Sequence, residues 1–169
     1  MKILVFSDSH GNARMMDRAL RAHSADTDLV VHLGDGKREF LQMMQSYPET
    51  AHICVNGNYE DPFFRSNEST AVVELDGLRF FLTHGHGYGV KRGIYELMDA
   101  AAERGCDLAL YGHTHVGDSR YTDLCKKTGR PMWIVNPGSI TLPKDGFEPK
   151  YAIIRIIGGK PLISLASIE

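Results

Sequence analysis

The first 55 residues alternate short apolar runs with stretches in which apolar residues recur at helical spacing. The three runs, Lys2 to Phe6, Leu29 to Leu33 and Ala51 to Val55, have the length and β-branched content of buried strands. The first helical stretch follows Asn12, a favourable N-cap residue, and the second ends near Tyr47-Pro48. A β-α-β-α-β order favours a parallel sheet, because each helix carries the chain back to the start of the next strand.

The chain changes character after this parallel unit. Asp76-Gly77 separates two apolar runs, at 71–75 and 78–82, and strongly indicates a two-residue hairpin turn. A long helix is expected from Val90 to Arg104, with Gly105 as its C-terminal cap. Further strands are expected at Leu108–Tyr111, Pro131–Val135, Tyr151–Ile157 and Leu162–Ile168, with Gly158-Gly159 as a turn. We therefore predict one α/β domain over residues 1–169 that contains two sheets.

Composition argues against several classes of function. The formal net charge of −2 over 169 residues indicates neither a nucleic-acid-binding nor a membrane-binding surface. The N-terminal apolar stretch is too short for a signal peptide or a membrane span. The cysteines, Cys54, Cys106 and Cys125, are odd in number and widely spaced, which disfavours a disulfide framework or a structural zinc site. We expect a cytoplasmic protein.

Five short polar motifs begin where predicted buried strands end. Ligands of α/β proteins gather beyond the carboxyl ends of parallel strands, so the motifs are expected to meet in one small volume. The motifs are Asp8-Ser9-His10, Gly34-Asp35, Gly57-Asn58, Thr83-His84-Gly85-His86 and Gly112-His113-Thr114-His115. Together they supply seven potential metal ligands: Asp8, His10, Asp35, Asn58, His84, His113 and His115.

The donor types limit the metals and the chemistry. Carboxylate and imidazole without thiolate suit Mn²⁺, Fe, Co²⁺, Ni²⁺ or Zn²⁺, of which we take manganese first. Seven ligands exceed the needs of one ion, whereas two ions about 3.5–4 Å apart, bridged by Asp35, would use them all. Such a pair activates a bridging hydroxide for in-line attack on phosphorus and neutralises charge on the phosphoryl oxygens.

Each motif alone has an ordinary structural explanation. Asp8 and His10 could cap the following helix, and Gly34-Asp35 and Gly57-Asn58 are common turn pairs. Paired histidines at strand ends are less common, and the ordered set of five carries the metal-site prediction. By contrast, His32 lies inside a predicted strand and is expected to be a hydrogen-bonded core residue.

The order D-x-H, G-D, G-N, H and G-H-x-H resembles the calcineurin-like metallophosphoesterase superfamily. The short chain and the segment Asn136-Pro137-Gly138-Ser139 resemble its small YfcE/YsnB phosphodiesterase branch. The resemblance covers the chain from Asp8 to Ser139 and implies a four-layer α/β/β/α sandwich with two mixed sheets. It also places the segment from Asn136 to Ser139 in a loop near the site.

The resemblance further implies how the ligands divide. One ion would be held by Asp8, His10, Asp35 and His115. The other would be held by Asp35, Asn58, His84 and His113. Asn58 and His86 are expected to act in catalysis, because they would stabilise charge on the phosphoryl oxygens together with the metals.

Tyr59 departs from the pattern, because many relatives carry histidine after the G-N pair to assist leaving-group departure. A phenol releases its proton only well above neutral pH, so Tyr59 is a poor general acid. Glu60, Asp61 or His86 could serve in its place. We therefore expect a preference for substrates with good leaving groups.

These observations predict a metal-dependent phosphoesterase that acts on a small phosphodiester or phosphate ester, with diesters favoured over monoesters. The rival from another class is a non-catalytic, metal-binding scaffold of the retromer-subunit type, although such scaffolds tend to lose motif histidines. A nuclease is disfavoured by the neutral charge. Lys144 is either a phosphate contact or a solvated lysine, and the segment from Tyr59 to Ser69 is a candidate specificity loop or homo-oligomer contact.

Overall fold

The computed structural model describes residues 1–122 and 129–168. Its α-helices are α1 (Ala13–His23), α2 (Lys37–Met44) and α3 (Tyr95–Glu103). The first five strands are β1 (Lys2–Phe6), β2 (Leu29–His32), β3 (Ala51–Cys54), β4 (Thr70–Leu75) and β5 (Leu78–Thr83). They are followed by β6 (Leu108–Leu110), β7 (Gly117–Thr122), β8 (Met132–Pro137), β9 (Lys150–Ile157) and β10 (Lys160–Ser167). Short 3-10 turns cover Asn67–Ser69 and His86–Tyr88.

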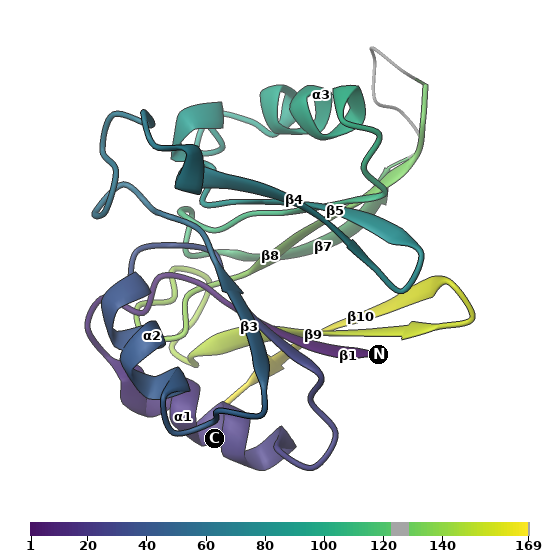
Figure 1. Cartoon of the computed structure of the whole chain (residues 1–169). Helices are drawn as coiled ribbons and strands as arrows, with labels where there is room; N and C mark the ends of the chain where they lie inside the picture. The colour runs from purple at the N-terminus through teal and green to yellow at the C-terminus, as the bar shows by residue number, and fades with distance from the viewer. Residues whose placement is uncertain (123–128, 169) are drawn as a thin grey trace.

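Two mixed five-stranded sheets pack face to face. The first has the order β10-β9-β1-β2-β3, in which β1, β2 and β3 are parallel and β9 and β10 form an antiparallel hairpin. The second has the order β4-β5-β6-β8-β7, with a parallel centre and antiparallel edges. Helices α1 and α2 cover the outside of the first sheet and α3 covers the second (Figure 1). The predicted four-layer α/β/β/α sandwich is confirmed.

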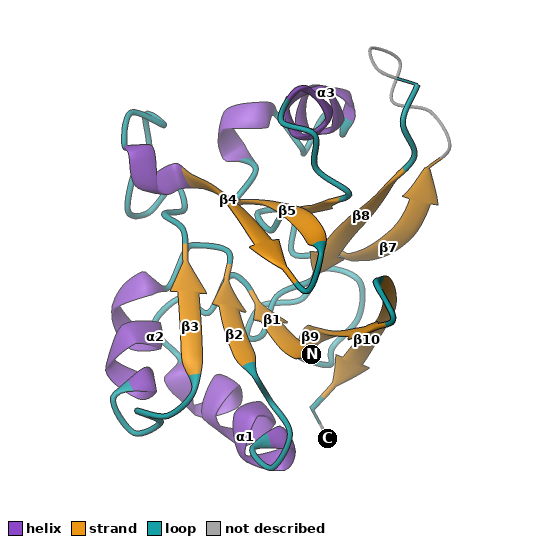
Figure 2. Cartoon of the chain, turned by 45° about the vertical axis from the view of Figure 1, so that its right-hand side comes forward, coloured by secondary structure: helices purple, strands orange, loops and turns teal. Residues whose placement is uncertain are grey.

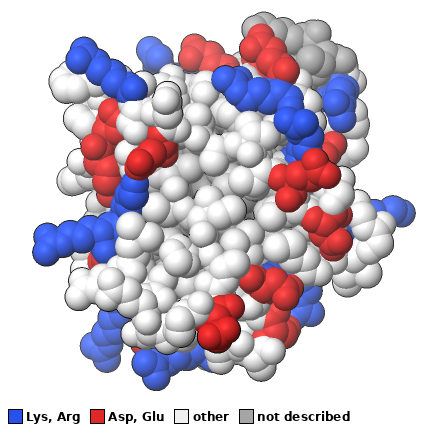
Figure 3. All heavy atoms as spheres, viewed as in Figure 1, with Lys and Arg blue, Asp and Glu red and all other residues white. Residues whose placement is uncertain are grey.

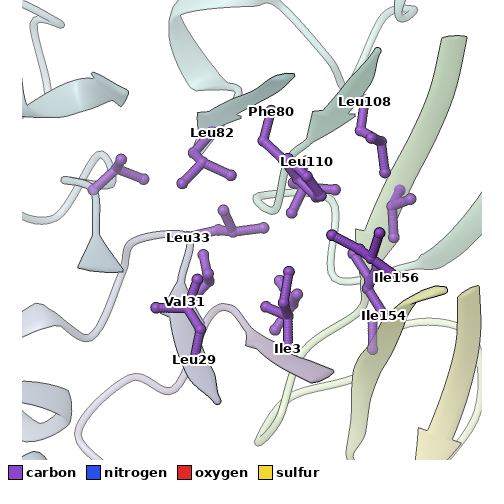
Figure 4. Packing of buried hydrophobic residues seen from close by; sticks show 14 residues of the cluster. Ile3, Leu29, Val31, Leu33, Phe80, Leu82, Leu108, Leu110, Ile154 and Ile156 are labelled. Atoms are coloured by element: carbon purple, nitrogen blue, oxygen red, sulfur yellow. The ribbon is translucent and has the colours of Figure 1, made fainter. Parts of the chain in front are cut away.

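Three apolar clusters hold these layers together. The central cluster lies between the sheets, where Ile3 and Val31 face Phe80 and Leu110 from the opposite sheet (Figure 4). A second cluster packs α3 on its sheet, and a third packs α1 and α2 on theirs. Because side chains alternate across a strand, each buried strand contributes to two clusters at once.

The third helix is shorter than the sequence indicated. It begins at Tyr95 rather than Val90, and the residues between them form turns. Gly93 lies in this segment, and glycine disfavours a helix interior by about 0.5–1 kcal/mol. Val90 and Ile94 nevertheless pack in the cluster under α3, so the apolar stripe marks the buried face but not the helix start. Gly105 follows the helix with φ +67°, as predicted for its cap.

The run at Ala51 was predicted to be a buried strand, but β3 is exposed at Ala51 and His52 because it is the edge strand of its sheet. Other local predictions are confirmed. Asn12 caps α1 through a hydrogen bond from Arg14 N to its side chain. The hairpin at Asp76-Gly77 is confirmed, because β4 and β5 pair antiparallel around it. The polar segment from Gly117 to Arg130 begins as the edge strand β7, and its residues 123–128, with Cys125, lie outside the described residues.

On the face shown in Figure 3, acidic and basic side chains are mixed around the margin, and the centre carries mostly uncharged residues. In the described residues, no helix has both the length and the apolar character needed to cross a membrane. The cytoplasmic location stays a prediction.

Candidate metal centre

Seven polar side chains from both sheets converge at the carboxyl ends of five strands. In Figure 2 the arrowheads of β2 and β3 point the same way, so the loops after them lie at one edge of the sheet. Two of the side chains follow β1, one follows β2, one follows β3, one follows β5 and two follow β6. They are Asp8, His10, Asp35, Asn58, His84, His113 and His115.

The first cluster joins the loops after β1 and β6. One donor atom from each of Asp8, His10 and His115 lies within 4.8 Å of the other two. His115 Nε2 is 3.2 Å from Asp8 Oδ1 and 3.3 Å from His10 Nε2. His115 Nδ1 donates to the carbonyl of Leu142 at 2.7 Å, which leaves the Nε2 lone pair directed into the cluster.

The second cluster joins the loops after β2, β3, β5 and β6. His84 Nε2 lies 3.3 Å from Asp35 Oδ2, 3.1 Å from His113 Nδ1 and 3.2 Å from Asn58 Oδ1. His84 Nδ1 donates to the carbonyl of Leu33 at 2.7 Å, so its Nε2 is also free to act as a donor to a metal. Asp35 belongs to this cluster, and its bridging role stays a prediction.

Asp8 lies between the clusters and carries an unpartnered oxygen. Its Oδ2 accepts hydrogen bonds from Ser7 Oγ at 2.6 Å and from His113 N at 3.0 Å. Its buried Oδ1 accepts no hydrogen bond of suitable geometry, although His115 Nε2 lies 3.2 Å away and His84 Nε2 lies 3.8 Å away. A buried carboxylate oxygen without a partner is costly unless a cation neutralises it. The donor set therefore fits a pair of divalent metal ions.

Electrostatics keep two of the donors, Asp8 and His113, in the forms that bind metals. Burial opposes ionisation of Asp8, but the imidazoles of His115 and His84 and a neighbouring hydroxyl outweigh it and lower the pKa of Asp8 to about 2. Burial, reinforced by His84 and Lys91, lowers the pKa of His113 to about 4. Near neutral pH these groups are a carboxylate and a neutral imidazole, the forms that bind metals.

His86 lies beside the second cluster and is not among its grouped donors. Its ring centroid is 5.5 Å from that of His84 and 6.1 Å from that of His113. Nε2 donates to the carbonyl of Asp61 at 2.9 Å, and Nδ1 is buried without a hydrogen-bond partner. Burial lowers the pKa of His86, so the neutral ring presents an acceptor nitrogen.

Glu60 and Asp61, two of the candidate leaving-group acids, are engaged in hydrogen bonds within the protein. Both oxygens of Glu60 accept backbone N–H groups. Asp61 accepts hydrogen bonds from backbone and hydroxyl groups of residues 65–69. Tyr59 is 75% exposed, and its ring meets that of His10 edge to face.

A cavity of about 780 Å³ opens over the metal-ligand candidates. Its wall also includes Glu39, Glu60, Lys91, Leu142 and Lys144. Lys91 and Glu39 were not among the candidates from the sequence, because neither stands in a motif at a strand end. Among the described residues, neither Lys91 nor Lys144 has an ion-pair partner for its ammonium group, so the cavity mouth carries two available positive charges.

The segment Asn136-Pro137-Gly138-Ser139 supports the site from behind. Asn136 Nδ2 donates to the carbonyl of Gly112 and to Thr114 Oγ1, both at 3.0 Å. Ser139 Oγ donates to the carbonyl of Asp8 at 2.8 Å. The segment therefore holds the backbone of two ligand loops and lies near the site as expected. It is a loop only in part, because Asn136 and Pro137 are the last residues of β8. His32 is also a hydrogen-bonded core residue, as predicted.

Sequence comparison finds relatives that are named as metallophosphoesterases or phosphodiesterases. Probable metallophosphoesterase YsnB of Bacillus subtilis is 28% identical over 158 residues, which cover 92% of this chain and 85% of the relative. Phosphodiesterase YfcE of Escherichia coli is 30% identical over 175 residues, covering 91% and 87%.

Solved structures share the architecture. A predicted phosphoesterase from Streptococcus pneumoniae aligns with a TM-score of 0.77 and 26% identity, covering 98% of this chain and 88% of that one. Vps29 of Entamoeba histolytica, crystallised with zinc, aligns with a TM-score of 0.67 over 99% of both chains. Its 17% identity makes this a likeness of fold alone. The family model for the calcineurin-like phosphoesterase superfamily domain matches residues 1–158, and the chain therefore belongs to that superfamily.

Proposed function

We propose that this protein is a dinuclear metal-dependent phosphodiesterase. Asp8, His10, Asp35 and His115 hold one divalent ion. Asp35, Asn58, His84 and His113 hold the other. The observation that carries the proposal is the meeting of two donor clusters around the unpartnered, buried Oδ1 of Asp8. When bound, two divalent ions activate water and neutralise charge on a phosphoryl group.

The chain's own residues bind and orient the substrate. Asn58 faces the phosphoryl oxygens. The catalytic role of His86 stays a prediction, because its Nε2 proton is donated to the carbonyl of Asp61 and its Nδ1 is an acceptor. Lys91 and Lys144 attract the anion from the cavity mouth. Lys91 lies near His113 and contributes to its lowered pKa, whereas Lys144 lies near His115 and partly opposes the rise in pKa that the hydrogen bond with Asp8 causes. A small phosphodiester fits this arrangement, because its single negative charge is matched without a long basic groove.

Leaving-group departure is the weak step in this arrangement. Glu60 and Asp61 accept hydrogen bonds within the protein, and His86 offers an acceptor nitrogen rather than a proton. Tyr59 is exposed at the cavity edge. We therefore expect leaving groups whose conjugate alcohol or phenol has a low pKa to depart readily, and those from simple aliphatic alcohols to depart slowly.

The test uses metal-stripped protein with bis-p-nitrophenyl phosphate and a dialkyl phosphodiester. Each substrate is assayed before and after addition of Mn²⁺, Fe²⁺, Co²⁺, Ni²⁺ or Zn²⁺, and bound metal is counted. We expect activity on the nitrophenyl diester to return with two metals per chain, and the dialkyl diester to react far more slowly. Comparable rates on the two diesters would contradict the leaving-group argument alone. Absence of both bound metal and activity would overturn the enzymatic proposal.

A protein-interaction scaffold is the second candidate, and the likeness of fold to Vps29 supports it. All seven ligand positions are filled, which favours the enzyme. Two bound metals without hydrolysis of any phosphoester in a broad panel would make the scaffold the better description. Three points stay predictions: manganese as the native metal, the formation of a homo-oligomer, and the role of the segment from Tyr59 to Ser69.

A further inference from the structure

The N-terminus of α2 is capped by a side chain from another loop. No side chain at the start of α2 caps its first amides. Instead, Oε1 of Glu60, which follows β3, accepts hydrogen bonds from Gly36 N at 2.9 Å and Lys37 N at 3.1 Å. A carboxylate at this position also interacts favourably with the helix dipole.

The second oxygen of Glu60 reaches the ligand loops themselves. Oε2 accepts hydrogen bonds from Asp35 N at 3.0 Å and from Gly57 N at 2.7 Å, directly before Asn58. One carboxylate thus accepts four backbone N–H groups and ties together the loops after β2 and β3. Asp35 has φ +56°, a conformation that this clamp holds while its side chain points into the cluster.

The two clamped loops lie so close that only glycine fits between them. A Cβ atom on Gly57 would lie 2.2 Å from Asp35 Oδ1, and one on Gly34 would lie 2.5 Å from Gly57 N. Tyr59 N adds a hydrogen bond of 2.9 Å to Asp35 Oδ1. The position of the Asp35 carboxylate therefore depends on contacts with the loop that contains Glu60.

A second carboxylate, Glu39 from the helix that Glu60 caps, holds the opposite loop. Glu39, in the first turn of α2, accepts hydrogen bonds at Oε1 from Ser9 Oγ at 2.8 Å and from Gly11 N. These two residues flank His10. Ser9 Oγ also lies 3.0 Å from His32 Nε2, so this contact continues into the core.

We propose that Glu60 and Glu39 are positioning residues, one for each donor cluster. Glu60 orients Asp35 and Asn58, and Glu39 orients His10. The inference rests on the proposed function of the metal centre, but it concerns residues outside the predicted ligand set. Because outer-shell partners orient metal ligands, removing one weakens metal affinity by about 10–100-fold.

The variants Glu60→Gln and Glu39→Leu test these two assignments. Leucine is used at position 39 because Glu39 accepts both hydrogen bonds at Oε1, and the oxygen of a glutamine could keep them. At Glu60 the amide turns one of the two acceptor oxygens into an NH₂ group that faces backbone donors, so one half of the clamp is lost while side-chain volume is kept. Glu68→Gln is the matched control, because Glu68 also reaches α2 through Lys37 but contacts no predicted metal ligand. Mn²⁺ alone is the probe in calorimetric titrations of each metal-free protein.

We expect two Mn²⁺ sites in the wild-type protein and in Glu68→Gln. Glu60→Gln should weaken the site that contains Asn58 by about 10–100-fold and the other site less, because only Asp35 is shared between them. Glu39→Leu should weaken only the site that contains His10, by a similar factor. The Glu60→Gln defect should be non-additive with Asn58→Ala, because both act on the same site. Two sites of wild-type affinity in Glu60→Gln would overturn the proposal, as would equal weakening of both sites by Glu39→Leu.

Amide hydrogen exchange in the metal-free proteins provides a readout that does not depend on metal binding. Glu60→Gln should accelerate exchange either at Gly36 or at Asp35 and Gly57, whichever group loses its acceptor oxygen, but not at Gly11, whereas Glu39→Leu should accelerate exchange at Gly11 alone. Unchanged exchange at these amides would contradict the clamp. If the wild-type protein binds no Mn²⁺ but the exchange pattern holds, the proposed metal function fails and the clamp stands. If Glu60→Gln does not fold, Glu60→Asp replaces it.

Discussion

Left-handed backbone conformations serve different purposes at the hairpin end and at the metal-centre end of the molecule. At the hairpin end, Asp76 and Gly77 have φ +49° and +81°, and Gly158 and Gly159 have φ +57° and +72°. These residue types suit such turns. At the metal-centre end, the left-handed positions fall on the candidate ligands themselves. The described residues contain seven non-glycine positions with positive φ, and five are Asp8, His10, Asp35, His113 and His115.

Different contacts hold the two kinds of turn. The hairpin turns are compatible with their own residues, whereas the ligand loops are held by contacts from elsewhere. Asp8 N donates to the carbonyl of Gly34 at 3.1 Å, and His10 N donates to that of Asp35 at 3.0 Å. Each unusual backbone conformation costs about 1–3 kcal/mol, which the surrounding structure must offset. Strain is thus concentrated where side chains must point inward to one small volume.

Two aspartates with similar backbone conformations provide the sharpest contrast. Asp35→Asn removes a negative donor at the metal centre, whereas Asp76→Asn changes a hairpin residue with nearly the same φ, and asparagine tolerates both. We expect Asp35→Asn to lower kcat/KM on bis-p-nitrophenyl phosphate by more than about 100-fold, since a ligand matters more than its outer-shell partners. Asp76→Asn should retain wild-type activity. Equal activity of the two variants would remove the distinction between the two ends.

Buried ionisable groups should make the metal-centre end sensitive to acid. Burial lowers the pKa of His32 to about 4, against 6.5 for an ordinary histidine. The unfolded chain therefore takes up a proton before the folded one does, and stability is lost as pH falls from 6.5 towards 4. The loss attributable to His32 is about 3 kcal/mol.

Urea unfolding of metal-free protein across this pH range measures the effect. His32→Asn should show a shallower fall in unfolding free energy, whereas His52→Asn, at the more exposed strand β3, should follow the wild-type curve. Parallel curves for His32→Asn and the wild-type protein would show that His32 is not responsible.

The smallest expected effect compares alanine with glycine at each end. His113 has φ +68°, so in metal-free protein His113→Gly should be more stable than His113→Ala by about 1 kcal/mol. At Ala101 in α3 the order should reverse, because Ala101→Gly loses about 1 kcal/mol of helix propensity. At the hairpin, Gly77→Ala should cost about 1 kcal/mol. Thermal unfolding of the variants gives the sign directly, and a more stable alanine at position 113 would argue against backbone strain there.

Local pattern was sufficient for most elements and for the donor types. The β-branched run of β1, the Asn12 cap and the Asp76-Gly77 hairpin each depend on residues within a few positions of one another, so they could be predicted directly. The predicted start of α3 was wrong, because that prediction also used local pattern alone. A helical stripe records which residues face the core, and Val90 faces the core without being helical.

The amino-acid sequence by itself determined the order of strands and helices and the seven donor side chains at the strand ends. Only the tertiary structure decided which donors share a cluster, because His10 and His115 are 105 positions apart and meet only when the two sheets pack. It also placed Lys91 at the cavity mouth and bound Glu60 to four backbone amides. The physical reason is that a hydrogen bond between distant loops depends on sheet register and layer packing, which no local spacing in the chain encodes.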